Sequence, residues 1–227
     1  MTITGISSMA TRQVLADLAI AYEKQSGVTV AVVSVGGVDA VKRVQAGEAF
    51  DVVFLAADAI NKLITSGHVL AGSRVDLVRS PVAVAVRTGA AAPDITSEEA
   101  VKQAVLAAPS ISFSTGPSGV FLSKLFERWG IADQIAPRLV LAPPGVPVGS
   151  LVARGDVALG FQQLSELLHL PGITVVGLLP GPIACITTFS AGLCPACSQP
   201  EAVRAMLAFM TSTASAATIR RNGMEPA

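Results

Sequence analysis

The sequence has little charge, and the charge it has is balanced. Only 14% of its 227 residues are Asp, Glu, Lys or Arg, and the 16 basic residues equal the 16 acidic ones in number. A neutral chain lacks the basic footprint of a protein that binds nucleic acid or an anionic membrane surface. Hydrophobic residues make up 51%, yet no run approaches the roughly 18 uninterrupted apolar residues of a membrane helix. We therefore expect no nucleic-acid partner and no membrane insertion.

Cysteine is scarce as well. Cys185, Cys194 and Cys197 lie late in the chain, and an odd number clustered there is no disulfide framework. The spacing of the last two invites a redox interpretation, but a thioredoxin-like motif follows an early strand of a βαβ unit. A structural metal site needs a second ligand pair, which is missing. We expect small buried hydrophobes here, and neither a metal nor a cofactor.

A secretion signal is the third thing missing. Residues 2–6 read as a strand directly after Met1, without a basic segment, an apolar segment or a small-residue cleavage site. As given, the chain is expected in the cytoplasm. It is expected in the periplasm if a leader was removed.

Strand and helix patterns alternate along the whole chain. Leu15, Leu18, Ala19 and Tyr22 recur at helical spacing, for example, and residues 28–33 alternate like a strand. This alternation predicts an α/β fold with parallel-rich, doubly wound sheets. The expected strands are 3–6, 28–33, 51–55, 82–86, 111–113, 139–141, 158–161, 174–176 and 184–190. The expected helices are 11–25, 39–46, 59–66, 97–107 (capped by Thr96 or Ser97), 120–129, 149–154, 164–168, 200–212 and 214–222.

Four strand-to-helix junctions are rich in small or hydroxylated residues. Such a junction offers unpaired backbone N–H groups and the positive end of a helix dipole, which together hold an anion. In open α/β sheets, ligands gather beyond the carboxyl ends of the strands. Simple helix capping explains any one junction, but four of them favour an anion site. They are Ser7-Ser8, Gly36-Gly37-Val38, Ala56-Ala57-Asp58 and Ser114-Thr115-Gly116-Pro117-Ser118-Gly119.

Longer motifs resemble the periplasmic molybdate-binding protein family, in order and nearly end to end. They are Ser7-Ser8-Met9, the segments 42–47 and 51–58, Pro117-Ser118-Gly119, Trp129-Gly130, the segment 151–160 and the closing segment 220–224. The resemblance implies a type 2 periplasmic-binding-protein fold, with two α/β lobes, two crossover strands and a ligand cleft between the lobes. The expected lobes are residues 1–80 plus 186–227, and residues 81–185.

The resemblance also implies ligand-binding residues. The family's first-helix hydroxyl falls on Ser8. Its backbone contacts fall on Ala57, on Ser118 and Gly119, and on Gly145 or Val146. With their neighbours, the candidate ligand-binding residues are Ser7, Ser8, Arg12, Gly36, Gly37, Val38, Ala57, Ser114, Thr115, Ser118, Gly119, Val146 and Gln163.

Two of these positions depart from the family pattern. Gly36-Gly37-Val38 stands where the family has a serine-rich loop, so a hydroxyl donor is replaced by backbone amides. Gln163 stands where the family has a tyrosine. A glutamine amide both donates and accepts hydrogen bonds, which suits a carboxylate. The ligand is therefore expected to be a small anion, either an oxyanion or a carboxylate.

Two functions stay open. The first is a monomeric small-anion-binding protein that closes around its ligand by hinge motion, with an ABC-transporter permease as partner if it is exported. The second is an isomerase similar to aconitate isomerase, on the same fold, which shifts a proton along an unsaturated tricarboxylate. That reaction needs a base, and donors for the carboxylates and the developing enolate.

Candidate bases for that reaction are few. His68 is expected to be exposed, and His169 to be a partly buried residue at a helix end. Asp39 and Asp58 lie at helix starts, where an acid usually serves the helix dipole. Among the cations, Arg12 lies one turn beyond Ser8 and is the best placed to hold a carboxylate. The weaker cation candidates are Arg74, Arg79 and Lys124.

Overall fold

The structure, a computed structural model, describes residues 2–142 and 146–227. The chain divides into unit 1 (Met1–Ser80 with Thr188–Ala227) and unit 2 (Pro81–Thr187). It passes from unit 1 to unit 2 inside strand β4 (Val75–Arg87) and returns at the start of β8 (Ile186–Leu193). The backbone contact expected at Gly145 lies outside the described residues.

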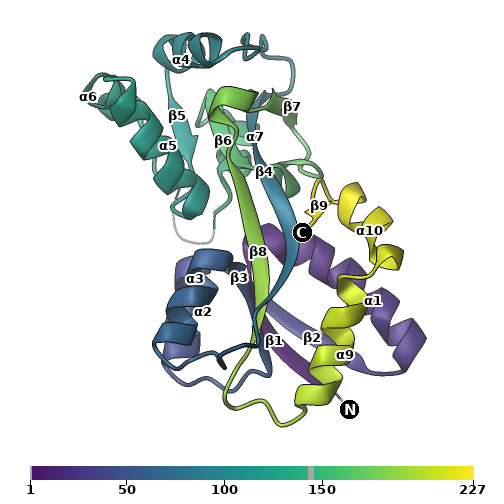
Figure 1. Cartoon of the computed structure of the whole chain (residues 1–227). Coiled ribbons are helices and arrows are strands. Elements are labelled where there is room, and N and C mark those ends of the chain that lie inside the picture. The colour runs from purple at the N-terminus through teal and green to yellow at the C-terminus, as the bar shows by residue number, and fades with distance from the viewer. Residues whose placement is uncertain (1, 143–145) are drawn as a thin grey trace. The chain divides into compact units, whose positions relative to one another are not determined.

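Unit 1 is built on parallel strands. Its strands are β1 (Thr2–Ser8), β2 (Thr29–Val35), β3 (Val52–Ala56), β9 (Glu225–Pro226), and the parts of β4 and β8 that it contains. β1 pairs in parallel with both β2 and β3, and β8 pairs antiparallel with β3 (Figure 1). Ser8 lies opposite Val35, and Ser7 lies opposite Phe54. The carboxyl ends of β1, β2 and β3 therefore meet at one edge of the sheet.

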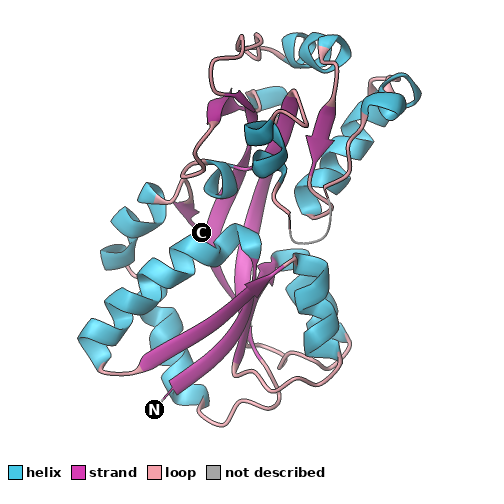
Figure 2. Cartoon of the chain, turned by 180° about the vertical axis from the view of Figure 1, so that it is seen from behind, coloured by secondary structure: helices cyan, strands magenta, loops and turns pink. Residues whose placement is uncertain are grey.

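Helices cover both faces of the unit 1 sheet (Figure 2). They are α1 (Arg12–Ser26), α2 (Gly37–Gln45), α3 (Ala57–Thr65), α9 (Pro200–Met210), α10 (Ala216–Arg221), and the 3-10 helices Met9–Thr11 and Thr213–Ser215. Successive side chains of a strand point to opposite faces. Ile3 of β1 accordingly packs in one cluster with Leu15 and Leu18 of α1. Ile6 packs in another cluster with Ile60 of α3, so the sheet lies between two helical layers.

Unit 2 has a mixed sheet. Its strands are β5 (Ile111–Phe113), β6 (Leu159–Gln163), β7 (Ile173–Leu178) and the second half of β4. β5 runs parallel to β6, whereas β4 is antiparallel to both β6 and β7. Phe113, the last residue of β5, lies opposite Phe161, two residues before the end of β6. The segment that follows β5 and the glutamines that end β6 therefore emerge at the same edge.

Helices pack on both faces of unit 2 as well. They are α4 (Glu98–Ala107), α5 (Pro117–Arg128), α6 (Ala132–Ile135), α7 (Val148–Arg154), α8 (Leu164–Leu167), and the 3-10 helices Ala136–Arg138 and Gly181–Ile183. On one face the ring of Phe126 lies 5.8 Å from that of Phe113 and 6.3 Å from that of Phe161, between centroids. On the other face α7 comes very close to β6. A Cβ on Gly160 would lie 2.5 Å from Cγ2 of Val152, so this approach needs a glycine.

The structure confirms the α/β class and changes several details. The expected stripe on α1 is buried, including Leu15, Leu18, Ala19 and Tyr22. The sheets are mixed rather than parallel-rich, because β4 and β8 run antiparallel to their neighbours. β4 also begins well before the expected residue 82 and continues through Pro81. The strand expected at 139–141 is wrong: only Leu139 forms a single bridge, to Ile111.

Among the described residues, no single helix is long and apolar enough to cross a membrane, although the bent pair Pro200–Met210 and Thr213–Arg221 meets the length and composition criteria with a 58° bend. Val203, Met206 and Ile219 of this pair are buried in the hydrophobic core of unit 1.

Candidate functional site

In unit 1, two α-helices start directly at the edge where β1, β2 and β3 end. α2 begins at Gly37, just after β2, and α3 begins at Ala57, directly after β3. The first amides of a helix have no partner within the helix. In the described part of the chain, no side chain caps α2 or α3, whose N-cap residues are Gly36 and Ala56. These amides therefore remain available to an anion, at the positive ends of two helix dipoles.

Ser8 lies beside the start of α2. It is buried, and its Oγ has no hydrogen-bond partner among residues 2–142 and 146–227. A Cβ on Gly37 would lie 3.8 Å from the Cβ of Ser8, which places the hydroxyl beside the first turn of α2. A buried hydroxyl without a partner is costly. Ser8 therefore has a donor and acceptor to offer a ligand.

The other candidates of unit 1 differ in what they can contribute. Ser7 points to the opposite face of β1 from Ser8, and its Oγ bonds to Oγ of Ser34 at 2.8 Å. Arg12 is exposed in the first turn of α1. Val38 is 54% exposed, so its amide rather than its side chain would serve an anion. The structure thus groups Ser8 with Gly36–Val38 and leaves Ser7 bound within the sheet.

Carboxylates border the same helix starts. Asp39 and Asp58 are exposed in the first turns of α2 and α3, where an acid complements the helix dipole. Their negative charge opposes an anion held by the neighbouring amides. An anion at this edge would therefore be held by hydrogen bonds rather than by net positive charge.

In unit 2, the segment after β5 forms a tight serine-containing turn. Oγ of Ser114 and Oγ of Ser118 are 2.9 Å apart and share a hydrogen bond. α5 starts immediately afterwards, and Ser118 and Gly119 are buried in its first turn. A Cβ on Gly119 would lie 1.6 Å from the carbonyl oxygen of Ser114, so only glycine fits there. Thr115 is exposed beside this turn.

Gln163 ends β6 at the same edge of unit 2. Its side chain is 3% exposed, and its Nε2 donates to Oγ1 of Thr187 at 2.8 Å. In the part of the chain that the structure describes, its Oε1 has no hydrogen-bond partner. The side-chain carbonyl of Gln163 is therefore open to a hydrogen-bond donor. Val146 is half-buried just before α7 and packs on the Val148 cluster.

Sequence reasoning did not identify Glu166 as a candidate functional residue. It lies in α8, which starts directly after Gln163. Its Oε1 accepts a hydrogen bond from Nε2 of Gln162 at 2.8 Å, and Oε1 of Gln162 accepts from the amide of Gly149 at 3.0 Å. Burial raises the pKa of Glu166 to about 7, against the opposing effect of the Gln162 hydrogen bond. The spacing of Gln162 and Glu166 was the available signal, but it does not reveal burial.

The expected bases are placed less favourably. His68 lies past the C-terminal end of α3, half-buried rather than exposed, with its Nδ1 2.9 Å from Oγ of Ser66. The length of α3, roughly 13 Å, separates it from the helix starts. His169 is exposed, so the expectation of partial burial is wrong: α8 ends at Leu167 and leaves His169 in the turn beyond it.

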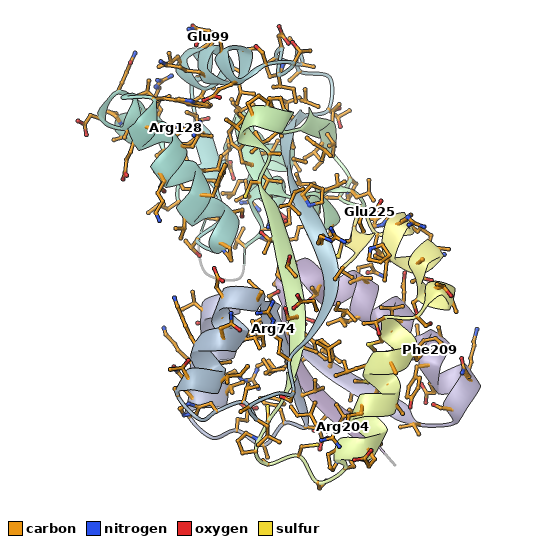
Figure 3. All side chains as sticks on the ribbon, viewed as in Figure 1. Arg74, Glu99, Arg128, Arg204, Phe209 and Glu225 are labelled. Carbon is orange, nitrogen blue, oxygen red and sulfur yellow. The ribbon has the colours of Figure 1, made fainter. Side chains whose placement is uncertain are left out.

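The weaker cation candidates are Arg74, Arg79 and Lys124. Arg74, labelled in Figure 3, forms an ion pair with Asp76 at 2.7 Å and bonds to Asn61. Arg79 and Lys124 are exposed, on β4 and α5.

Burial raises the pKa values of the three cysteine thiols. Burial raises the pKa of the Cys185 thiol to about 11 and that of Cys194 to about 12. Cys194 is 4% exposed. These thiols stay protonated at neutral pH, whereas a nucleophilic or redox cysteine needs a lowered pKa. Within the described residues, no group of three or more His, Cys, Asp or Glu side chains is arranged to hold a metal ion.

Comparisons with known proteins show what the chain as a whole is similar to. The chain is 39% identical over 231 residues to a protein named aconitate isomerase from a Pseudomonas species, covering 99% of this chain and 88% of the relative. Among solved structures, the Azotobacter vinelandii periplasmic molybdate-binding protein has a TM-score of 0.80 at 20% identity, covering 98% of each chain. The tungstate ABC transporter protein of Geobacter sulfurreducens has a TM-score of 0.75 at 17% identity, covering 97% and 98%.

At such identities the structural likeness establishes the fold, which is the type 2 periplasmic-binding-protein fold of these proteins. The sequence match is equally extensive. Residues 3–225 match the family described as bacterial extracellular solute-binding protein. The chain therefore belongs to the bacterial extracellular solute-binding protein family.

Proposed function

We propose that this chain binds a small carboxylate anion through backbone amides at helix starts and the hydroxyl of Ser8. The observation that carries the proposal is the buried Ser8 Oγ, which has no partner among the described residues and lies beside the first turn of α2. Leaving such a hydroxyl unpaired costs roughly 1–3 kcal/mol. A bound anion would remove that cost. Membership of a solute-binding family supports a binding role.

Two features favour a carboxylate over a molybdate-like oxyanion. The start of α2 offers the amides of Gly36–Val38 and no hydroxyl, where the resemblance to molybdate-binding proteins implies serines. Gln163 keeps a buried acceptor, Oε1, free of partners in the described part of the chain. Bare molybdate has no hydrogen to donate to that acceptor, whereas the hydroxyl group of a hydroxy carboxylate does.

The second candidate function is isomerisation of an unsaturated tricarboxylate such as aconitate. The 39% identity to a protein of that name, over 99% of this chain, favours it. So does the presence of Glu166, whose pKa of about 7 suits a group that both takes and returns a proton near neutral pH. The reaction adds and removes no atoms and needs no cofactor.

Calorimetric titration of the purified chain tests the binding proposal. The ligands are citrate, cis-aconitate and trans-aconitate, compared with molybdate, tungstate, sulfate and phosphate. A carboxylate at about 100 times its dissociation constant should stabilise the protein by roughly 2.7 kcal/mol in a parallel thermal-unfolding series. Binding of molybdate or tungstate alone would contradict the choice of a carboxylate.

Ser8→Ala tests the residue that carries the proposal. Loss of a hydrogen bond to a charged ligand, worth roughly 1.5–3 kcal/mol, should weaken binding about 10- to 100-fold. Ser97→Ala is the matched control, because Ser97 caps α4 by accepting from the amide of Ala100 at 3.1 Å. It should leave the affinity unchanged. Equal affinity in Ser8→Ala and the parent chain would remove Ser8 from the site.

Partner and location differ between the two functions. As a binding protein, the chain would act outside the cytoplasm as a monomer and deliver its ligand to an ABC-transporter permease. As an isomerase it needs no permease, and turnover of bound ligand separates the two. Gel filtration with light scattering checks the monomer.

A further inference from the structure

Glu166 is an acid that anion binding alone leaves without a role. It lies in α8, immediately after β6, near the strand end that carries Gln163. Its side chain is half-buried, and a carboxyl group in such surroundings is costly to keep charged. No helix dipole explains its place, because α8 is a helix of 4 residues.

Hydrogen bonds fix the orientation of the groups around Glu166. The amide of Gly149 in α7 can only donate, so Oε1 of Gln162 must face it, at 3.0 Å. Nε2 of Gln162 then has to point at Glu166, and it donates to Oε1 of Glu166 at 2.8 Å. Because Oε1 faces an N–H donor, a proton on this carboxyl group belongs on Oε2. The backbone of α7 thus determines which oxygen of Glu166 binds and releases a proton.

Charged neighbours contribute little to the chemistry of Glu166. β6 and β7, which pack against α8, carry no ionisable side chain. On α7, Arg154 forms an ion pair with Asp156 at 2.9 Å. On β4, Arg87 lies against Gly155, and His169 beyond α8 is exposed. Burial raises the pKa of Glu166, and the hydrogen bond from Gln162 partly opposes that rise.

We propose that Glu166 is the proton-transfer residue of the isomerase, with Gln162 as the residue that positions it. This inference rests on the second candidate function. The Glu166 carboxylate takes a proton from the methylene carbon of the tricarboxylate, at Oε2. The electron pair that is released spreads over the allylic system and its carboxylate. The neutral acid then returns the proton to the carbon at the other end, so the double bond moves and Glu166 is regenerated.

The test compares Glu166→Gln with the parent chain on cis- and trans-aconitate. Calorimetry measures binding, and proton NMR in deuterated water measures both isomerisation and deuterium entry at the methylene carbon. Glu166→Gln should lose turnover and deuterium entry by about 100- to 10,000-fold, the usual contribution of general acid–base catalysis. Its dissociation constant should stay within about threefold of the parent value.

Glu99→Gln is the matched control. Glu99, labelled in Figure 3, lies exposed on α4 and accepts from Nε2 of Gln103 at 2.7 Å, the same pair of residue types at the same spacing. This variant should keep both binding and turnover. Glu166→Asp keeps the acid and covers the case in which Glu166→Gln does not fold; it should bind aconitate and turn it over more slowly.

The pH profile separates positioning from structural support. A base with a pKa of about 7 makes kcat/KM fall as the pH drops below that value. Gln162→Met removes the hydrogen bond that lowers this pKa, so the fall should begin at higher pH. An unshifted profile would overturn the role of Gln162.

The outcomes distinguish a failure of the role of Glu166 from a failure of the isomerase function on which it rests. A parent chain that binds aconitate without converting it eliminates the isomerase and, with it, the role of Glu166. A parent chain that converts aconitate, together with an equally active Glu166→Gln, overturns the role of Glu166 alone. Loss of binding in Glu166→Gln also overturns it, because the residue would then hold the ligand rather than move a proton.

Discussion

The stability of this protein should depend on pH through Glu166, even without ligand. Burial raises its pKa from an ordinary 4.5 to about 7 in the folded chain. A group with a raised folded-state pKa stabilises the fold fully below its unfolded value and loses that contribution as the pH rises through its folded value. The gap between the two pKa values corresponds to about 3 kcal/mol at most, and partial exposure of the side chain reduces it toward about 1 kcal/mol.

Glu166→Gln should abolish that dependence, because a glutamine resembles the neutral acid at every pH. Urea unfolding of ligand-free protein at about pH 5 and about pH 8 measures it. The parent chain should lose about 1–3 kcal/mol between the two conditions relative to Glu166→Gln, which should be the more stable variant at about pH 8. Glu99→Gln, from an exposed pair, should keep the parent's dependence. The same dependence in Glu166→Gln and the parent would refute the argument that burial controls this carboxyl group.

Two further predictions concern local structure. Gly119→Ala should destabilise unit 2 by roughly 3 kcal/mol or more, because its Cβ would lie 1.6 Å from the Ser114 carbonyl oxygen. Thermal unfolding measures this loss. Gly181→Ala is the control, because no atom of the described residues lies within 4 Å of the added carbon, and its stability should be nearly unchanged. Equal losses of stability in the two variants would contradict the steric argument. Ser97→Ala should cost about 1 kcal/mol, or roughly 2–4 °C in Tm, through loss of the α4 cap; an unchanged Tm would show that the cap is unimportant.

The sequence by itself determined most of the order of helices and strands, apart from the strand expected at 139–141, and the chemistry available at their junctions. Helix and strand periods are local properties, so the spacing of Leu15, Leu18 and Tyr22 was enough to identify the buried face of α1. The helix starts at Gly37 and Ala57 were also identified from the sequence, because the small residues that precede them, Gly36 and Ala56, have no side chain that caps a helix. Sequence resemblance supplied the fold, which no local pattern contains.

Only the tertiary structure decided which polar groups are engaged. Ser97 and Ser8 look alike as residues at helix starts, yet Ser97 accepts a backbone amide, while Ser8 Oγ has no partner within the described residues. Ser7 was indistinguishable from Ser8 until strand pairing bonded it to Ser34. Glu166 resembled any helix-surface acid until burial raised its pKa. The hydrogen-bond partners of these side chains and the burial that desolvates them come from residues distant in the chain, so they cannot be predicted from a local sequence pattern.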